Sequence, residues 1–300
     1  MEKVLITGAS GFLGTAIVRE AVKNTDWDVY AVCSGRHSVT FPSEVHAVQA
    51  DLRDSAQRQS LMQDICPTIL IHLAWNLEGR DFLNSDTNLL WLEISIHLMQ
   101  LFAENGGKQM FFAGSSAEYG YVQSVCREDG IPMPTDLYGI CKNAFTQIAL
   151  HFCGKHNICY TTARFFSVYG PGERHLLHAI PVAIDTLLSG KRFICKAPDN
   201  RWDYIYIDDA ANAAIRIVKS GYAGIVNVAS SEPVDMRTVF CTIAEKIGAE
   251  KLLIFENPQG ERRQLVGENR ILCETIGFSL RSTIKDGLCK TVNWWKESMR

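Results

Sequence analysis

The sequence predicts an α/β fold: a Rossmann-type doubly wound parallel sheet with a smaller, interleaved α/β substrate-binding lobe. Short apolar runs, typical of strands buried on both faces, alternate with longer segments of helical period. A glycine-rich turn follows the first apolar run directly. After about residue 165 the alternation loosens into shorter, mixed segments, which indicates a second lobe.

Apolar runs and helical periods place the elements along the chain. Strands are expected at 3–7, 28–33, 46–49, 68–73, 109–114 and 159–165, with helices at 12–24, 54–64, 84–105 and 137–155. Later helices are expected near 176–189, 209–219 and 235–247, and later strands near 192–195, 203–207, 225–228 and 251–255. Residues 1–165, with 201–228 returning to them, should form the dinucleotide-binding domain, and 166–200 and 229–300 the substrate-binding lobe.

The composition excludes several classes of protein. A net charge of −3 without a basic block gives no reason to expect a nucleic-acid partner. The chain shows neither a basic leader nor an apolar run long enough to cross a bilayer, so we expect a cytoplasmic protein that does not bind membranes. The ten cysteines contain no C-x-x-C pair, which favours free thiols and predicts no metal site.

The stretch ITGASGFLG spaces Gly8, Gly11 and Gly14 three residues apart, between a strand and a helix. Glycine allows a tight turn and lets a pyrophosphate approach the free amides at the helix N-terminus. In this context the turn predicts dinucleotide binding. The residues expected to contact the cofactor here are Gly8, Ser10, Gly11, Phe12, Leu13 and Gly14.

The end of the second predicted strand bears on which dinucleotide is bound. NAD-binding proteins usually carry a carboxylate there for the adenosine ribose. This chain has no acid at that point but offers Ser34 and Arg36, and a guanidinium fits a ribose phosphate well. We therefore favour NADP(H) over NAD(H), the alternative being that Arg36 is a solvated loop residue. Asp51 and Leu52, after the third strand, are expected beside the adenine.

With these motifs the chain resembles the extended short-chain dehydrogenase/reductase family, in its nucleotide-sugar-modifying branch of NAD-dependent epimerases and dehydratases. Within this branch it is most like the 4-keto-6-deoxysugar-nucleotide reductases. The resemblance rests on TGASGFLG, DLRD, HLAW, Asn88 in DTNLL, GSSAEYG, YGICK, RFFSVYGPG and DYIYIDDAANA, in family order. It implies further cofactor contacts from Leu73, Ala74, Asn88, Tyr138, Lys142 and Phe165.

The resemblance also implies a catalytic set of Ser115, Tyr138 and Lys142. Tyr138 and Lys142 stand four residues apart and share one face of a helix. The ammonium, together with a positive nicotinamide ring, should lower the pKa of the phenol and make it an acid/base near neutral pH. Ser115 would polarise the reacting carbonyl, with Ser116 as the alternative hydroxyl.

Groups missing beside Ser115 narrow the expected chemistry. The dehydratases of the branch carry an Asp-Glu pair where this chain has Ser116 and Ala117, and the epimerase-reductases carry a cysteine at the place of Ala117. His178 precedes AIP as their acid does, but without that cysteine it is interpreted as a substrate contact or a structural residue. What remains is hydride transfer at a single sugar carbon.

The family binds a nucleotide-diphosphate sugar between the two lobes, which gives the expected substrate. The residues predicted to contact it are Trp75, Ser116, Ser167, His178, Arg201 and Arg263. Ser167 stands where the family has asparagine, and Trp202 stands where it has a phosphate-binding arginine, with Arg201 one place earlier.

We therefore predict NADPH-dependent reduction of the 4-keto group of a nucleotide-linked 6-deoxyhexulose, with Tyr138 as proton donor. One alternative is an NAD-dependent nucleotide-sugar 4-epimerase, and another is a non-catalytic dinucleotide-sensing scaffold. The apolar faces of the helices at 84–105 and 137–155 predict a homodimer.

Overall fold

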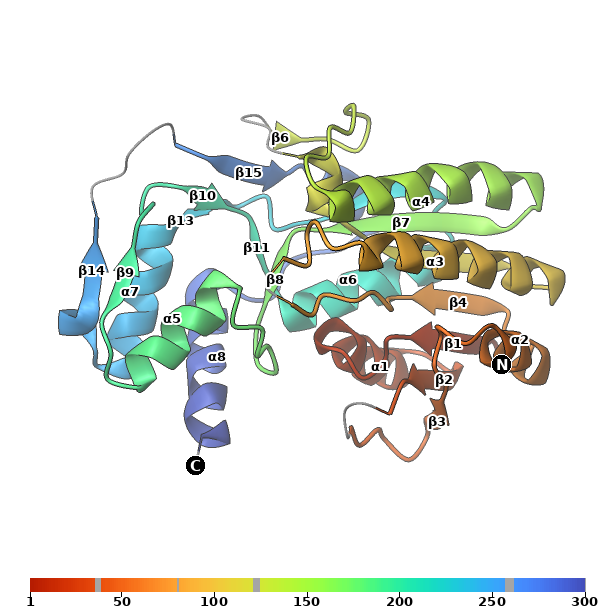
Figure 1. Cartoon of the computed structure of the whole chain (residues 1–300), viewed down its shortest axis with the longest axis horizontal. Helices are drawn as coiled ribbons and strands as arrows, with labels where there is room; N and C mark the ends of the chain where they lie inside the picture. The colour runs from red at the N-terminus through yellow and green to blue at the C-terminus, as the bar shows by residue number, and fades with distance from the viewer. Residues whose placement is uncertain (36–38, 80, 121–124, 257–261, 300) are drawn as a thin grey trace.

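A seven-stranded parallel sheet forms the centre of the molecule in the computed structural model, which describes residues 1–35, 39–79, 81–120, 125–256 and 262–299. Its strand order is β12-β7-β5-β4-β1-β2-β3 (Figure 1). The strands are β1 (Lys3–Thr7), β2 (Asp28–Cys33), β3 (His46–Gln49), β4 (Ile69–His72), β5 (Gln109–Ser115), β7 (Cys159–Phe165) and β12 (Gly224–Val228). The order reverses between β1 and β4, and a doubly wound sheet binds ligands at such a point.

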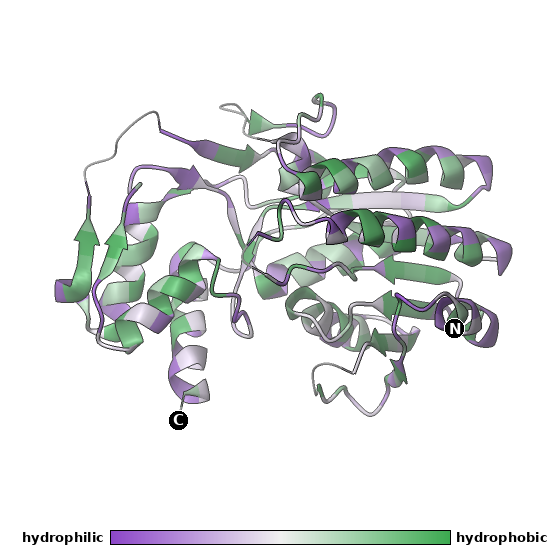
Figure 2. Cartoon of the chain, viewed as in Figure 1, coloured by the Kyte–Doolittle hydropathy of each residue, from purple (hydrophilic) through white to green (hydrophobic). Residues whose placement is uncertain are grey.

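Helices cover both faces of this sheet. One face carries α1 (Phe12–Asn24) and α6 (Ile207–Ser220), and the other carries α2 (Ser55–Ile65), α3 (Thr87–Glu104) and α4 (Leu137–Lys155). Coverage on both faces explains why the strands are apolar almost throughout, as Figure 2 shows for β1 and β4. The core under α1 and α6 continues without a break into the smaller lobe, where it includes Ile184, Phe240 and Val292.

The smaller lobe combines three helices with short strands. The helices are α5 (Ala179–Leu188), α7 (Met236–Ile247) and α8 (Ile284–Ser298). A four-stranded sheet has the order β13 (Val234–Asp235), β10 (Arg201–Trp202), β15 (Gln264–Gly267) and β6 (Val125–Cys126). Two further pairs are β11 (Tyr204–Tyr206) with β8 (Ser167–Tyr169), and β14 (Leu253–Phe255) with β9 (Phe193–Cys195). Single turns are η1 (Ser116–Tyr119), η2 (Glu250–Leu252) and η3 (Ile271–Thr275).

The expected fold class is confirmed, and the elements before residue 165 lie within a few residues of their predicted bounds. The prediction missed β6 and η1 before residue 165, and β8, β13, β15, η2 and η3 after it. It also expected one strand at 203–207, whereas the chain forms β10 and β11 with Asp203 between them. The buried Asp203 carboxylate accepts hydrogen bonds from the amides of Ser230, Ser231 and Gly267, and these contacts interrupt the strand. The division into domains stays a prediction.

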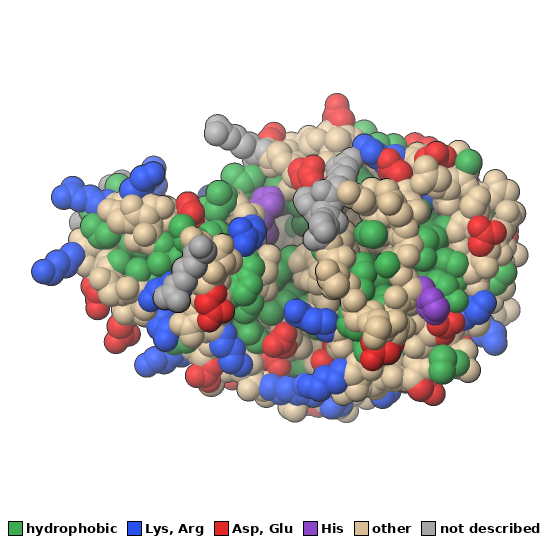
Figure 3. All heavy atoms as spheres, turned by 90° about the horizontal axis from the view of Figure 1, so that it is seen from below, with side chains coloured by type: hydrophobic (Ala, Val, Ile, Leu, Met, Phe, Trp, Pro, Cys, Tyr) green, Lys and Arg blue, Asp and Glu red, His purple; other side chains and the backbone are tan. Residues whose placement is uncertain are grey.

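The surface of the described chain mixes charges of both signs, as the face in Figure 3 shows. None of the described helices combines the length and the apolar character that crossing a membrane requires. Large apolar side chains are exposed on α3 and α4, which lie side by side in Figure 1. These side chains are Leu89, Leu90, Ile140 and Ile148.

Candidate active site

The glycine turn before α1 is shaped for a close ligand. Gly8 has a φ of +69°, and a Cβ there would lie 2.8 Å from the amide nitrogen of Ala74. A Cβ on Gly14 would lie 2.1 Å from the carbonyl oxygen of Gly8. No side chain caps α1 at Gly11, so the first amides of the helix are left for another partner. The turn therefore fits the pyrophosphate of a dinucleotide.

The structure describes only some of the residues at the end of β2 on which the cofactor prediction rests. Ser34 and Gly35 are exposed after Cys33, and no carboxylate stands among these three residues. Arg36, on which the NADP(H) preference rested, lies outside the described residues. Asp51 forms an ion pair with Arg53, and the adjacent Leu52 is buried.

The end of β4 contacts the glycine turn, as expected for the cofactor side. The amides of Leu73 and Ala74 both lie within reach of the Thr7 hydroxyl, at 3.3 and 3.4 Å. The backbone of Ala74 also forms the wall against which Gly8 packs. Phe165, at the end of β7, is 7% exposed, so it offers a cofactor little more than its edge.

Ser115, Tyr138 and Lys142 come together at the carboxyl end of the sheet. Ser115 ends β5, while Tyr138 and Lys142 lie in the first two turns of α4. Gly139 allows the helix to approach, because a Cβ there would lie 2.5 Å from the carbonyl oxygen of Ala117. The Ser115 hydroxyl oxygen accepts the amide of Ala117 at 3.1 Å, and the hydroxyl also hydrogen-bonds Tyr138.

The ammonium of Lys142 lies in an aromatic cage. Its Nζ is 4.1 Å from the ring centroid of Trp75, 4.5 Å from that of Phe112 and 5.7 Å from that of Tyr138. It also donates a 2.7 Å hydrogen bond to the carbonyl oxygen of Ala113. Burial lowers the pKa of Lys142 to about 7, so the amine changes charge near neutral pH.

The phenol of Tyr138 has a raised pKa rather than the lowered one expected from the sequence. Burial raises the pKa of Tyr138 to about 12, and the hydrogen bond with Ser115 only partly offsets this. The rings of Trp75 and Phe82 stand edge-on against Tyr138, which is half-buried. The charges of Glu118 and Asp136 raise the pKa of Tyr138 further. The lowering would have to come from the positive ring of an oxidised nicotinamide.

Asn88, predicted to contact the cofactor, makes its side-chain hydrogen bonds within the chain. The side chain is fully buried. Its Nδ2 donates to the carbonyl oxygens of Phe82 and Ser85 at 2.7 and 2.9 Å, which uses both amide hydrogens. Its Oδ1 accepts the indole N–H of Trp75 at 2.9 Å. Asn88 therefore holds Trp75 against Lys142 and closes the loop before α3.

His178, which is predicted to contact the substrate, is held by a buried carboxylate. Its Nδ1 lies 2.5 Å from Oε1 of Glu173, which is 4% exposed. The ring of His175 packs against His178, and Nε2 of His175 contacts the carbonyl oxygen of Leu77 at 2.8 Å. The His178 side chain is 46% exposed, so one side of a fixed imidazole remains open to a ligand.

Arg201 lies in the four-stranded sheet, and Arg263 lies directly before its strand β15. The amide of Arg201 donates to the carbonyl oxygen of Arg263 at 2.9 Å. The Arg201 guanidinium donates to the carbonyl oxygen of Pro233 at 2.8 Å. Ser116 follows Ser115 in η1, and Ser167 lies in β8; both are half-buried.

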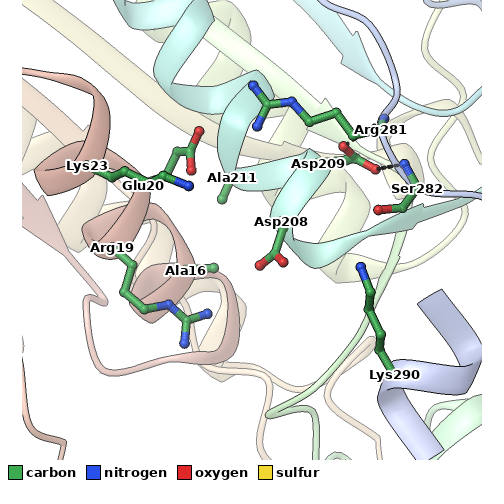
Figure 4. A pocket seen from close by; sticks show the side chains of 10 residues that line it. All are labelled: Ala16, Arg19, Glu20, Lys23, Asp208, Asp209, Ala211, Arg281, Ser282 and Lys290. Carbon is green, nitrogen blue, oxygen red and sulfur yellow. Dashed lines mark hydrogen bonds between the residues drawn. The ribbon is translucent and has the colours of Figure 1, made fainter. Parts of the chain in front are cut away.

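A separate polar cavity of about 370 Å³ lies between α1, α6 and α8 (Figure 4). It is lined by Ala16, Arg19, Glu20, Lys23, Asp208, Asp209, Ala211, Arg281, Ser282 and Lys290. The carboxylate of Asp209 accepts the amides of Arg281 and Ser282 at 3.1 Å and so fixes the segment leading to α8. None of the predicted site residues lines this cavity.

Two charged residues close to the site escaped the sequence prediction. Glu118 and Arg164 form a buried ion pair directly behind Ser115. The available signal was a charged residue within each of two motifs that are otherwise apolar or small, GSSAEYG and TTARFF. Glu173 was missed in the same way, although it stands in the glycine- and proline-rich loop before His178.

The chain is similar to a family model, to named relatives and to solved structures. A family model described as "NAD dependent epimerase/dehydratase family" matches residues 4–229. GDP-mannose 3,5-epimerase 1 of Oryza sativa subsp. indica is 24% identical over 326 residues, covering 99% of this chain and 82% of its own length. A putative UDP-glucose 4-epimerase of Methanocaldococcus jannaschii is 24% identical over 312 residues, covering 99% of both chains. The solved structure of MoeE5 in complex with UDP-glucuronic acid and NAD is 25% identical, covers 99% of both chains and has a TM-score of 0.84.

Proposed function

The chain belongs to the NAD dependent epimerase/dehydratase family, and on this premise we propose that it is a nucleotide-sugar 4-epimerase. Membership makes it an enzyme of the nucleotide-sugar type that uses a nicotinamide dinucleotide. The proposal replaces the 4-keto reductase expected from the sequence as the leading candidate, because the named relatives are epimerases.

The observation that carries the proposal is the make-up of the catalytic cluster. Ser115, Tyr138 and Lys142 lie together, and η1 then continues with Ser116 and Ala117. Neither Ser116 nor Ala117 can act as an acid or base on a neighbouring carbon, as elimination of water or epimerisation beside the carbonyl would require. The cluster therefore suits oxidation and reduction at one carbon, which a 4-epimerase and a 4-keto reductase share, and the 4-epimerase among the relatives favours the first of these.

The residues of the chain would act as follows. A bound nicotinamide dinucleotide supplies the hydride acceptor and donor. The Tyr138 oxygen takes the proton of the 4-hydroxyl and returns it when the carbonyl is reduced from its other face. The Ser115 hydroxyl donates a hydrogen bond to the same oxygen and stabilises its developing charge. Lys142 supplies positive charge one helical turn from the phenol.

A 4-keto reductase is the second candidate, and one observation favours it. Cys33, Ser34 and Gly35 offer no carboxylate to the adenosine ribose, as a protein selecting NADP(H) would require. The NADP(H) preference therefore remains a proposal tied to this second candidate. The epimerase would hold NAD(H) and consume none, whereas the reductase would need added NADPH.

The substrate is proposed to be a sugar linked to a nucleoside diphosphate, with UDP-sugars tested first. The UDP-glucuronic acid in the MoeE5 structure and the UDP-glucose in the archaeal relative's name support this order. Arg201 and Arg263, which are joined by a backbone hydrogen bond, are the proposed diphosphate contacts. His178 and Trp75 would contact the sugar.

A panel of substrates tests the function. The purified protein is incubated without added cofactor with UDP-glucose, UDP-glucuronic acid and their GDP- and dTDP-linked counterparts, and the products are analysed by NMR. The 4-epimer of one substrate is expected. Turnover only with NADPH and a 4-keto-6-deoxysugar would favour the reductase instead. Dinucleotide binding without any turnover would favour the sensing scaffold and contradict both enzymes.

We also propose that the enzyme is a homodimer through α3 and α4. Leu89 and Leu90 on α3, and Ile140 and Ile148 on α4, expose apolar side chains that a second copy would cover. Light scattering over a hundredfold range of concentration should give twice the chain mass, and Ile148→Asp should shift the protein toward monomer. A monomer mass throughout that range would contradict the proposal.

A further inference from the structure

A fully buried ion pair lies directly behind Ser115. Glu118 belongs to η1 and Arg164 to β7, and neither side chain is exposed. The Nε of Arg164 donates to Oε2 of Glu118 at 3.0 Å. A pair this deeply buried gains little over two apolar side chains, because each ion loses its water. A role in the neighbouring site explains its presence better than stability does.

The Glu118 carboxylate joins the elements that carry the candidate catalytic groups. Its Oε1 accepts the backbone N–H of Ser115 at 2.9 Å, at the end of β5. Its Oε2 accepts the hydroxyl of Thr146 at 3.2 Å, and Thr146 lies one turn of α4 beyond Lys142. Gly114 leaves room for the carboxylate, because a Cβ there would lie 2.5 Å from Oε1.

Arg164 holds the carboxylate from one side only. Its Nε is bound to Glu118, while its two terminal nitrogens have no hydrogen-bond partner among the described residues. Its guanidinium lies 4.4 Å from the ring centroid of Tyr119, whose hydroxyl donates to Asn227 at 2.8 Å. Because Arg164 donates only one hydrogen bond to it, the Glu118 carboxylate can also accept the amide of Ser115 and the hydroxyl of Thr146, which lies on the same helix as Lys142.

The charge of Glu118 also acts on the catalytic cluster. It raises the pKa of Lys142 against the effect of burial, and it raises the pKa of Tyr138. His72 on β4 also faces Lys142, but burial and the nearby ammonium lower its pKa to about 3, which keeps it neutral. Asp136, at the start of α4, acts in the same direction as Glu118 on Tyr138. Glu118 is thus the carboxylate that favours a charged Lys142.

We propose that Glu118 is a positioning residue that fixes the backbone of Ser115, ties it to the helix that carries Lys142 and favours the charged form of Lys142 within its aromatic cage. Its meaning for catalysis rests on the proposed function. The protonation of Lys142 can nevertheless be measured on the chain alone, so the two ideas can fail separately.

The test is a titration of Lys142 by NMR in protein labelled with ¹³C at lysine Cε. Comparison with Lys142→Met identifies the resonance, and the wild-type midpoint is expected at about 7. Glu118→Gln should lower that midpoint by about one pH unit or more, since it removes the attracting charge. Thr146→Val is the matched control: it removes a hydrogen bond to the same carboxylate but keeps the charge, so its midpoint should equal that of the wild type.

A second variant covers the case in which Glu118→Gln leaves Arg164 buried without its partner and does not fold. The double variant Glu118→Leu with Arg164→Met replaces both ions by apolar side chains, a change that buried pairs often tolerate. It should lower the Lys142 midpoint in the same direction. An unchanged midpoint in whichever variant folds would overturn the proposal, whatever the panel of sugars shows. If both ideas hold, the pH profile of turnover should move to lower pH with the midpoint.

Discussion

The cofactor half and the substrate half of the candidate site are held in place by different parts of the chain. On the cofactor side the site is formed mainly by backbone atoms. Gly14 packs against the carbonyl oxygen of Gly8, and Gly8 packs against the backbone at the end of β4. On the substrate side the contacts come from side chains, among them Trp75 over Lys142 and Glu173 beneath His178.

This difference shows how one fold can keep its cofactor while its substrate changes. A Cβ on either of these glycines would clash with the backbone of the turn, so few other residues are tolerated at these positions. Side chains around the sugar can be exchanged without moving a strand or a helix. Changes in the cofactor half should therefore cost binding and stability together, whereas changes in the substrate half should alter the kinetics and leave the fold intact.

The largest effect is expected at the meeting point of the two halves. Tyr138→Phe removes the hydroxyl that carries the proton and should lower turnover by about a thousandfold. Affinity for the dinucleotide should remain within a fewfold of wild type, as measured by calorimetry. Near-normal turnover in this variant would remove Tyr138 from the mechanism.

The next effect tests the backbone cradle. Gly14→Ala places a Cβ within 2.1 Å of the Gly8 carbonyl oxygen, so the turn must open. The strain should cost about 3 kcal/mol, which corresponds to roughly a hundredfold loss of dinucleotide affinity if it falls on the binding conformation. Gly154→Ala is the control, since a Cβ there meets nothing within 4 Å. Equal affinities in the two variants would mean that the turn does not hold the cofactor.

A smaller effect concerns the charge of Lys142. Its pKa of about 7 lies below the ordinary value of 10.5, so the unfolded chain binds more protons between these two pH values. The penalty for burying the ammonium is complete below pH 7 and fades as the pH rises toward 10.5. Lys142→Met should therefore gain about 2 kcal/mol in unfolding free energy, relative to wild type, when the pH is lowered from 9 to 6. Urea denaturation at both pH values measures the gain, and a pH-independent difference would contradict it.

The smallest effect should appear in the substrate half alone. His178→Ala removes a fixed, half-open imidazole and should raise the KM for the nucleotide sugar by about three- to tenfold, the worth of one hydrogen bond. The dinucleotide Kd should not move. An equal loss of dinucleotide affinity would contradict the claim that His178 contributes to substrate binding alone.

The cofactor half could be predicted from the sequence because its signals are local. Gly8 and Gly14 fall in one turn, and Tyr138 and Lys142 are four residues apart on one helix. Other parts of the site depend on contacts between distant residues. Glu118 and Arg164 are 46 positions apart, and nothing in either motif indicates that they pair. The bonds that Asn88 makes with Trp75 and with the carbonyl oxygen of Phe82 could not be predicted for the same reason.

The short strands of the second lobe could not be predicted, because β6, β10 and β13 contain two residues each and carry no periodicity. The carboxylate of Asp203, which accepts amides from two later segments, decides where β10 ends and β11 begins. Such a contact joins residues that are distant in the sequence, so no local sequence pattern indicates it.

Following a deuterium atom placed at carbon 4 of the accepted nucleotide sugar tests the central claim most directly. The label should be found at carbon 4 of both epimers, with no loss to water and no need for added reductant, because hydride leaves and returns at that one carbon. Exchange of the deuterium with solvent, or turnover that depends on added NADPH, would contradict the account.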